Sequence, residues 1–323
     1  MIFKLRLLKV TFWYTNNHKT YLHDIGALML KIIKIKADKI INNFLRLMSL
    51  RFYGNSLGIK TNRNWHELSK LAKKNYKKTI DNSDVSNSLK RTRLEVLGIS
   101  DSKDLQNYVH EYFEAGKGNQ LKSAPQILTM DIDSQKHTAN WIFAILQQFA
   151  NPVESFFESY FEPYHIIIQK TVPGATTADT SFGWHVDDNP DEYIKLFIYL
   201  NDVSEENGAF RAFDLESSQR ILQRKFKSYS PNDRIESQPI ADKFLIDNPE
   251  SLKILEGPAG TVLAFDNNLV HKGTAPRIGF RYAIQIPVIP SLKPLSLETV
   301  EKALTSPRLR DYPADPFIND HGF

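Results

Sequence analysis

Residues 183–188 read Gly-Trp-His-Val-Asp-Asp, and this short stretch is the best guide to the fold and the chemistry of the chain. Successive side chains of a β-strand point to opposite faces, so His185 and Asp187 would project side by side from one face. An imidazole and a carboxylate placed in this way are two of the three ligands of a facial metal site, in which two histidines and one carboxylate leave the remaining positions open. His271 is the candidate for the third ligand.

The sequence around this pair changes character at Pro163. After it, short runs rich in Ile, Val, Phe and Tyr alternate with Gly, Pro and Asn turns, and they predict strands over residues 165–169, 193–200, 261–265 and 281–288. Several short strands without intervening helices are typical of a sandwich or jelly roll rather than of a parallel sheet. Antiparallel jelly-roll topology can bring His185 and His271 together although they lie far apart in the sequence.

Helices dominate the first half of the chain. Asp101 and Ser102 can cap a helix that Gly116 ends, and a second helix is predicted from about His137 to Phe149, before Asn151-Pro152 stops it. Between residues 21 and 50, apolar residues recur at three- and four-residue steps with lysines between them, which indicates one or two amphipathic helices. Such a helix either packs on its own domain with a solvated basic face or binds an anionic lipid surface or nucleic acid.

Composition places the chain among globular proteins and divides its charge unevenly. The sequence has 323 residues, 41% of them hydrophobic, and a formal net charge of +4. Residues 1–80 contain 17 Lys or Arg but only three acidic residues, so the basic N-terminal region is a candidate for binding an anionic surface or ligand. Lysines and arginines interrupt every apolar run before it reaches the roughly 20 residues that span a bilayer. We therefore expect a cytoplasmic protein.

The absence of cysteine narrows the chemistry. Disulfides, thiolate zinc sites, iron–sulfur clusters and cysteine nucleophiles are all excluded, so a metal must be held by His, Asp or Glu. The sequence also lacks a Gly-rich phosphate loop followed by Lys-Ser or Lys-Thr, a GxSxG elbow and an HExxH helix.

His271 lies in a setting that suits a ligand. A Gly-rich turn at residues 257–260 leads into a predicted strand, a polar turn follows, and His271 begins the next strand. Ten residues later comes Arg281, at the start of another predicted strand. A strand arginine that faces into a barrel is costly to bury unless it meets an anion, and its planar guanidinium suits a carboxylate.

Taken together, these residues resemble the Fe(II)- and 2-oxoglutarate-dependent oxygenases, particularly the phytanoyl-CoA hydroxylase-like and prolyl-hydroxylase-like branches. The resemblance covers about residues 164–290. It is carried by the HxD pair, the distant histidine, the arginine that follows it, and the segments Tyr199-Leu200-Asn201-Asp202-Val203 and Glu206-Asn207-Gly208-Ala209-Phe210. The resemblance implies that His185, Asp187 and His271 bind Fe(II), that Arg281 binds 2-oxoglutarate, and that Tyr199 lies beside this cosubstrate.

The resemblance also implies a fold and a reaction. The fold is an α+β architecture with a double-stranded β-helix, the cupin-like jelly roll, and a helical N-terminal region. The reaction consumes O₂ and 2-oxoglutarate, releases succinate and CO₂, and hydroxylates a small-molecule, lipid or sugar substrate. Asp187 stands where the halogenases of the family have a small residue, so halogenation is not expected.

The predicted organisation has three parts. A basic, mainly helical region spans residues 1–125, the oxygenase core with its supporting helices spans 126–293, and a C-terminal helix and tail span 294–323. Residues 217–256 form a polar insertion within the core that could cover a site as a lid.

The substrate cannot be inherited from either branch. Val172-Pro173-Gly174 lacks the tyrosine that prolyl-hydroxylase-like members often carry there, and no Gly-Ser-His turn follows the Asn207-Gly208 strand as in the phytanoyl-CoA branch. Two alternatives stay open. One is a prolyl-type hydroxylase of protein side chains. The other is a non-catalytic cupin-like binding module whose basic N-terminal region associates with membrane or nucleic acid.

Overall fold

The computed structural model describes residues 63–305 except residues 123, 179, 188–192 and 229–230. The amphipathic stretch predicted over residues 21–50, and most of the basic region that is a candidate for binding an anionic surface or ligand, lie outside the described residues. Within the described residues, no helix is long and apolar enough to cross a membrane.

Eleven strands and nine α-helices make up the described part of the chain. The strands are β1 Leu94–Ile99, β2 Asn119–Leu121, β3 Ala124–Thr129, β4 Tyr160–Pro163, β5 Ile167–Thr171, β6 Ile194–Tyr199, β7 Phe210–Phe213, β8 Leu252–Leu255, β9 Thr261–Asp266, β10 His271–Lys272 and β11 Arg281–Ser291. The helices are α2 Arg63–Asn75, α3 Asp84–Thr92, α4 Lys103–Glu114, α5 Ile132–Lys136, α6 Ala139–Gln148, α7 Ala150–Phe157, α8 Leu215–Gln223, α9 Pro231–Asp247 and α10 Leu297–Thr305, with a 3-10 turn, η1, at Pro249–Ser251.

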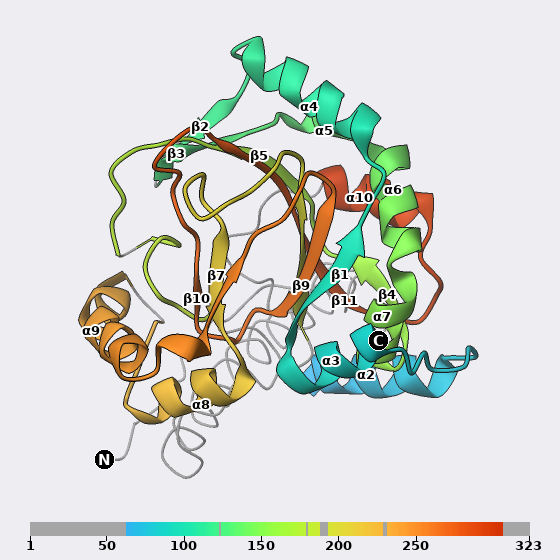
Figure 1. The fold of residues 1–323 in the computed structure, drawn as a ribbon. Coiled ribbons are helices and arrows are strands. Elements are labelled where there is room, and N and C mark those ends of the chain that lie inside the picture. Colours follow the sequence, from blue (N-terminus) through green and yellow to red (C-terminus); the bar gives the residue numbers. More distant parts are fainter. Residues whose placement is uncertain (1–62, 123, 179, 188–192, 229–230, 306–323) are drawn as a thin grey trace, which may run out of the picture. The chain divides into compact units, whose positions relative to one another are not determined.

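The strands form two antiparallel sheets (Figure 1). The larger sheet has eight strands in the order β1-β9-β6-β11-β5-β3-β2, with β4 paired to β11. The smaller sheet has the order β10-β7-β8. A cluster of buried apolar side chains joins the two sheets, because it takes Phe197 and Leu263 from the larger one and Phe210 and Ala212 from the smaller one. This is the predicted α+β fold with a jelly-roll core.

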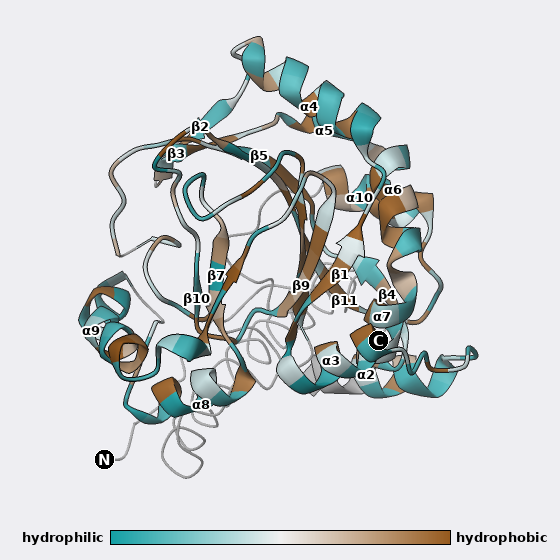
Figure 2. Ribbon diagram, in the orientation of Figure 1, coloured by the Kyte–Doolittle hydropathy of each residue, from teal (hydrophilic) through white to brown (hydrophobic). Residues whose placement is uncertain are grey.

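Strand β6 shows how the sequence builds this sandwich. Ile194, Leu196 and Ile198 point to the outer face of the larger sheet, where they join the main apolar core. Phe197 and Tyr199 alternate with them and point between the sheets. Because both faces are covered, the strands read as nearly continuous apolar runs, and Figure 2 shows the strands of the larger sheet mostly in hydrophobic colours.

Helices cover the outer face of the larger sheet, and α4, α6, α7 and α10 lie on one side of it in Figure 1. The helix predicted after Ser102 is confirmed as α4, which buries Leu105, Val109 and Phe113. The helix predicted from about His137 to Phe149 is confirmed as α6, which ends at Gln148, before Asn151-Pro152, and a separate helix, α7, begins at Ala150. Pro152 lies in the first turn of α7, where the helix needs no hydrogen bond from its nitrogen.

The predicted insertion is more ordered than its polar sequence indicates. It contains most of α8 and all of α9, and its last residues form β8, which pairs with β7 in the smaller sheet. Strands β1 and β2, from the region predicted to be mainly helical before residue 126, likewise belong to the larger sheet. Both segments were hard to recognise because their strands are short and not strictly alternating. Helix α10 lies within the predicted C-terminal part.

Candidate metal centre

The structure brings His185, Asp187 and His271 together. One ligand atom from each lies within 4.8 Å of the others, which makes the three residues a candidate metal-binding group. The expected strand at His185 is reduced to a single antiparallel bridge with His271. Each of these two residues donates its backbone N–H to the carbonyl of the other at 2.9 Å. The histidines are therefore direct neighbours in the backbone, and their ring centroids are 4.3 Å apart.

Both imidazole rings are oriented by their own backbone. The Nδ1 atom of His185 lies 2.8 Å from the carbonyl oxygen of Gly183, and that of His271 lies 2.8 Å from the carbonyl oxygen of Leu269. A carbonyl oxygen can only accept, so each Nδ1 carries the proton and donates it. This fixes the tautomer and leaves the lone pair of each Nε2 free for a metal.

Asp187 faces the two free ring nitrogens. Its Oδ1 is 3.4 Å from Nε2 of His185, and its Oδ2 is 3.9 Å from Nε2 of His271. Lys195, from the inner face of β6, donates to Oδ2 at 3.0 Å. Burial by itself raises the pKa of the Asp187 carboxyl, but the Lys195 ammonium holds this pKa well below its usual range. The carboxylate is therefore ionised and available as a ligand.

His271 is buried between aromatic rings. The centroids of Phe210 and Phe265 lie 5.5 Å and 5.4 Å from the centroid of its ring. Burial, followed by the proximity of His185, lowers the pKa of His271 to about 3. The ring is neutral at physiological pH, which is the form that binds a metal.

Arg281 lies in the same sandwich, at the start of β11, with only 3% of its surface exposed. Its guanidinium donates to the carbonyl of Gly208 and to Oγ1 of Thr171, and it stacks 5.4 Å from the centroid of Phe197. Among the described residues, no carboxylate lies within ion-pair distance of it, and its Nε has no partner. Burial lowers the pKa of Arg281, but an arginine stays charged at neutral pH. The result is a buried cation with donor capacity left over.

The motif Asn201 to Gly208 holds this arginine in place. Asn201 accepts from the backbone N–H of Tyr282 at 2.7 Å and donates to the carbonyl of Phe280 at 3.1 Å, so it grips both neighbours of Arg281. Gly208 has a φ of +100°, and a Cβ there would lie 2.7 Å from the carbonyl oxygen of Thr274. Only glycine fits this position, and its carbonyl is the one that faces Arg281.

Tyr199 lies close to Arg281, but its hydroxyl is already engaged. It donates to the carbonyl of Leu255 at 2.7 Å and accepts from the backbone N–H of Phe210 at 3.1 Å. In this arrangement it has no proton to give to a carboxylate. A role as a donor to 2-oxoglutarate would require the bond to Leu255 to break.

The sequence analysis did not predict the contact of Lys195 with Asp187. It also did not predict that the insertion contacts residues 184–187, which carry two of the candidate metal ligands. A signal for Lys195 existed, because strict alternation along the predicted strand 193–200 places it on the same face as Phe197 and Tyr199. Nothing in the sequence identified Gln238 or Ser228, which hydrogen-bond to the residues on either side of His185.

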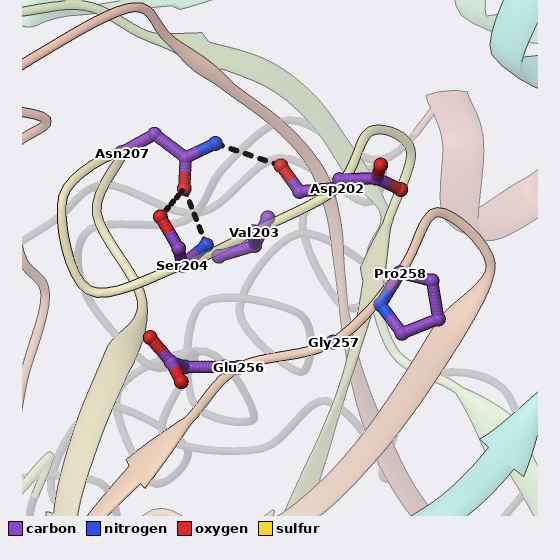
Figure 3. Close-up of a pocket in the computed structure, with 7 residues that line it drawn as sticks. All are labelled: Asp202, Val203, Ser204, Asn207, Glu256, Gly257 and Pro258. Atoms are coloured by element: carbon purple, nitrogen blue, oxygen red, sulfur yellow. Dashed lines mark hydrogen bonds between the residues drawn. The ribbon is translucent and has the colours of Figure 1, made fainter.

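A separate surface pocket lies between the loop after β6 and the turn before β9 (Figure 3). Its polar side chains form hydrogen bonds between these turns and within the first of them. Asp202 accepts from the backbone N–H of Ala259 at 2.9 Å, and Asn207 accepts from the N–H of Ser204 at 2.6 Å. We assign no ligand to this pocket.

Neither a protein-family model nor a curated protein sequence matches the chain. Solved structures do resemble it. The non-heme alpha-ketoglutarate-dependent carbocyclase SnoK from nogalamycin biosynthesis has 13% identity over 65% of this chain and 84% of its own, with a TM-score of 0.47. EctD from S. alaskensis with bound Fe has 13% identity, coverage of 68% and 82%, and a TM-score of 0.47. HygX from Streptomyces hygroscopicus, with nickel and 2-oxoglutarate bound, has 14% identity, coverage of 66% and 88%, and a TM-score of 0.43. Likenesses at these TM-scores do not assign the chemistry of this chain, which has to come from its own residues.

Proposed function

We propose that the chain is an Fe(II)- and 2-oxoglutarate-dependent oxygenase. The observation that carries the proposal is the presence, within one jelly-roll interior, of a His-Asp-His group and a buried arginine without a carboxylate partner among the described residues. A metal-binding module would need only the first of these. An enzyme that uses a dicarboxylate cosubstrate needs both.

The donor set fits Fe(II). Two neutral imidazole nitrogens and one carboxylate occupy one face of a metal and leave three positions open, which is the arrangement of non-heme iron oxygenases. His185, Asp187 and His271 would hold the ion. The two Nδ1 bonds to backbone carbonyls keep both rings in the geometry that this requires.

Arg281 fits the far carboxylate of 2-oxoglutarate. A charge-assisted pair between guanidinium and carboxylate supplies the counter-charge and uses the Nε that lacks a partner among the described residues. Phe197 lies against the guanidinium and excludes water from it. Tyr199 would contribute a wall beside the cosubstrate, with its hydroxyl turned to Leu255.

Iron bound at this centre would activate O₂ for the oxidation of a C–H bond. In the balanced reaction, 2-oxoglutarate loses CO₂ and is oxidised to succinate, and one atom of O₂ enters the succinate carboxylate. The other oxygen atom converts the C–H bond of the substrate to C–OH. We propose hydroxylation of a small molecule, lipid or sugar as the outcome, since Asp187 occupies the position that a bound halide would need.

The test is the turnover of 2-oxoglutarate without added substrate. Purified protein with Fe(II), ascorbate and O₂ is expected to form succinate slowly, and the Asp187→Ala variant is expected to form none above the level of free iron. Asp104→Ala is the matched control, because it makes the same substitution at an exposed position of α4. Binding of Fe(II) without binding or conversion of 2-oxoglutarate would contradict the enzyme proposal and favour a binding module.

A further inference from the structure

The segment from Trp184 to Asp187 has two backbone edges, and they are held in different ways. In an extended chain, the N–H and C=O of one residue point to the same edge and those of the next residue point to the opposite edge. His185 and Asp187 turn toward the strand of His271 and its preceding loop. His185 exchanges two bonds with His271, and the N–H of Asp187 donates to the carbonyl of Asn267 at 3.0 Å.

No strand of the described part of the chain pairs with the opposite edge, which is instead paired by side chains of the insertion. Oε1 of Gln238, on α9, accepts from the N–H of Trp184 at 2.7 Å, and its Nε2 donates to the carbonyl of Trp184 at 3.0 Å. The hydroxyl of Ser228 accepts from the N–H of Val186 at 2.9 Å and donates to the carbonyl of the same residue at 3.0 Å. All four backbone groups on this edge are therefore satisfied.

These two side chains are themselves fixed within the insertion. Nε2 of Gln238 also donates to the carbonyl of Arg234 at 2.7 Å, and the N–H of Lys227 donates to Oγ of Ser237 at 2.8 Å. The indole of Trp184 donates to Asp242 at 3.0 Å. The ligand segment thus contacts α9 through both its backbone and its side chains.

The face opposite the metal ligands is packed by the same insertion. Trp184 is 1% exposed and belongs to an apolar cluster with Phe213, Phe226 and Phe244. Val186 packs against this cluster. The segment is consequently fixed on two edges and one face, and only the face of His185 and Asp187 is left for a metal.

We propose that Gln238 and Ser228 are positioning residues of the metal centre, which replace a neighbouring strand and set the spacing of His185 and Asp187. The inference rests on the proposed function in that it requires a metal at this triad. A primary amide has one acceptor and one donor group, as a peptide unit has, so Gln238 can pair with a strand edge as another strand would. Ser228 does the same with one hydroxyl.

The consequence is that the metal affinity depends on the insertion. Partners that orient metal ligands typically change the affinity about 10- to 100-fold when they are removed. The dependence is reciprocal, since a metal that favours the ordered ligand segment must also favour the ordered insertion by the same free energy. The predicted lid over the site would therefore be a support behind the ligands.

The experiment is a titration with Co(II), an O₂-stable probe, of the full chain and of four variants. Gln238→Leu and Ser228→Ala are expected to weaken Co(II) binding about tenfold or more and to change the visible ligand-field spectrum of the bound ion. Gln238→Glu keeps the acceptor for the N–H of Trp184 but loses the donor, so its affinity for Co(II) should lie between those of the wild type and Gln238→Leu. Gln223→Leu, the same substitution at an exposed position of α8, should bind as the wild type does.

A second measurement covers the case in which a variant fails to fold. Amide hydrogen exchange of the wild type is expected to slow at Trp184, Val186 and Lys227 when Co(II) is added, while amides of β2 and β3 do not change. Unaltered affinity and spectrum in both Gln238→Leu and Ser228→Ala, or unaltered exchange at Lys227 in Co(II)-bound wild type, would overturn the inference. Failure of the wild type to bind Co(II) would instead overturn the proposed function.

Discussion

The metal triad and Arg281 share one jelly-roll interior, yet the protein prepares them differently. At the triad, both Nδ1 atoms donate to backbone carbonyls, and Asp187 is held by Lys195. At Arg281, the partners are a carbonyl and a weak contact to Thr171, and Nε has none in the described part of the chain. The side chains of the triad are engaged by the protein, while the guanidinium of Arg281 keeps a donor that no described residue uses.

This difference matches the two proposed roles, which are metal binding at the triad and binding of the cosubstrate carboxylate at Arg281. Under the proposed function, the triad has to present three ligand atoms in a fixed geometry, and the bonds to backbone carbonyls hold its two imidazole rings in place. Arg281 has to remain able to bind an anion, since a buried guanidinium already paired with a protein carboxylate would gain little from a second one. A substitution in the triad should therefore lower turnover, whereas a substitution of Arg281 should raise the KM for 2-oxoglutarate.

The largest effect is expected at the triad. Asp187→Ala should lower the rate of succinate formation about 1,000-fold or more, equivalent to roughly 4 kcal/mol, because two ligands no longer hold the ion on one face. The far-ultraviolet circular dichroism spectrum should stay unchanged, since Asp187 is not part of either sheet. Retained turnover in this variant would show that another group completes the site.

A smaller and different effect is expected at Arg281. Arg281→Ala should raise the KM for 2-oxoglutarate about 10- to 100-fold, since a charge-assisted hydrogen bond contributes roughly 1.5 to 3 kcal/mol. Co(II) affinity, measured by titration, should change less than about twofold. An unchanged KM would mean that a different basic residue binds the cosubstrate, and Arg277→Ala would then be the next variant to measure.

The buried neutral state of His271 predicts a pH effect on the metal-free protein. The pKa of this group falls from 6.5 to about 3 on folding, so the unfolded chain binds more protons between these values. The free energy of unfolding therefore rises with pH across this window and reaches its full value above pH 6.5. The contribution of His271 should make the free energy of unfolding about 2 kcal/mol lower at pH 5 than at pH 7.

Urea unfolding in the presence of a chelator measures this effect. The difference in unfolding free energy between pH 5 and pH 7 should shrink by about 2 kcal/mol in His271→Gln. The same difference in variant and wild type would show that His271 is protonated as easily in the folded protein as in the unfolded chain.

The smallest effect is expected at Tyr199. Tyr199→Phe removes the hydroxyl that bridges Leu255 and Phe210, which should lower the free energy of unfolding by about 1 to 2 kcal/mol. The KM for 2-oxoglutarate should change less than about threefold, because the hydroxyl proton is committed to Leu255. A rise as large as that of Arg281→Ala would instead assign Tyr199 to the cosubstrate.

Much of this arrangement was accessible from the sequence. Strands β5, β6, β9 and β11 follow from apolar runs with clear turn signals on either side, and α4 follows from its apolar spacing. The triad and Arg281 were found because their spacing in the sequence is distinctive, although only the fold brings His185 and His271 into one backbone bridge. The local sequence pattern was sufficient to predict a strand or helix wherever the residues of that element alone determine its structure.

The remainder depends on contacts between segments that are far apart. The end of α6 before Asn151-Pro152 was predicted, but the start of α7 at Ala150 was not, because a proline suits the first turn of a helix as well as the residues that follow one. Strand β8 and the contacts of Gln238 and Ser228 depend on how the insertion folds back onto the ligand segment. The residues around a glutamine on a polar helix do not indicate which distant residue it contacts, so the contact of Gln238 with Trp184 could not be predicted from the local sequence.

The central claim is that one interior holds both a metal at the triad and 2-oxoglutarate between that metal and Arg281. The most direct test is an anaerobic absorption titration of Fe(II)-loaded protein with 2-oxoglutarate, in wild type and in Asp187→Ala. We predict a visible metal-to-ligand charge-transfer band in the wild type that saturates at one equivalent and is absent from the variant. No band in the iron-loaded wild type, or an equal band in Asp187→Ala, would contradict the assignment.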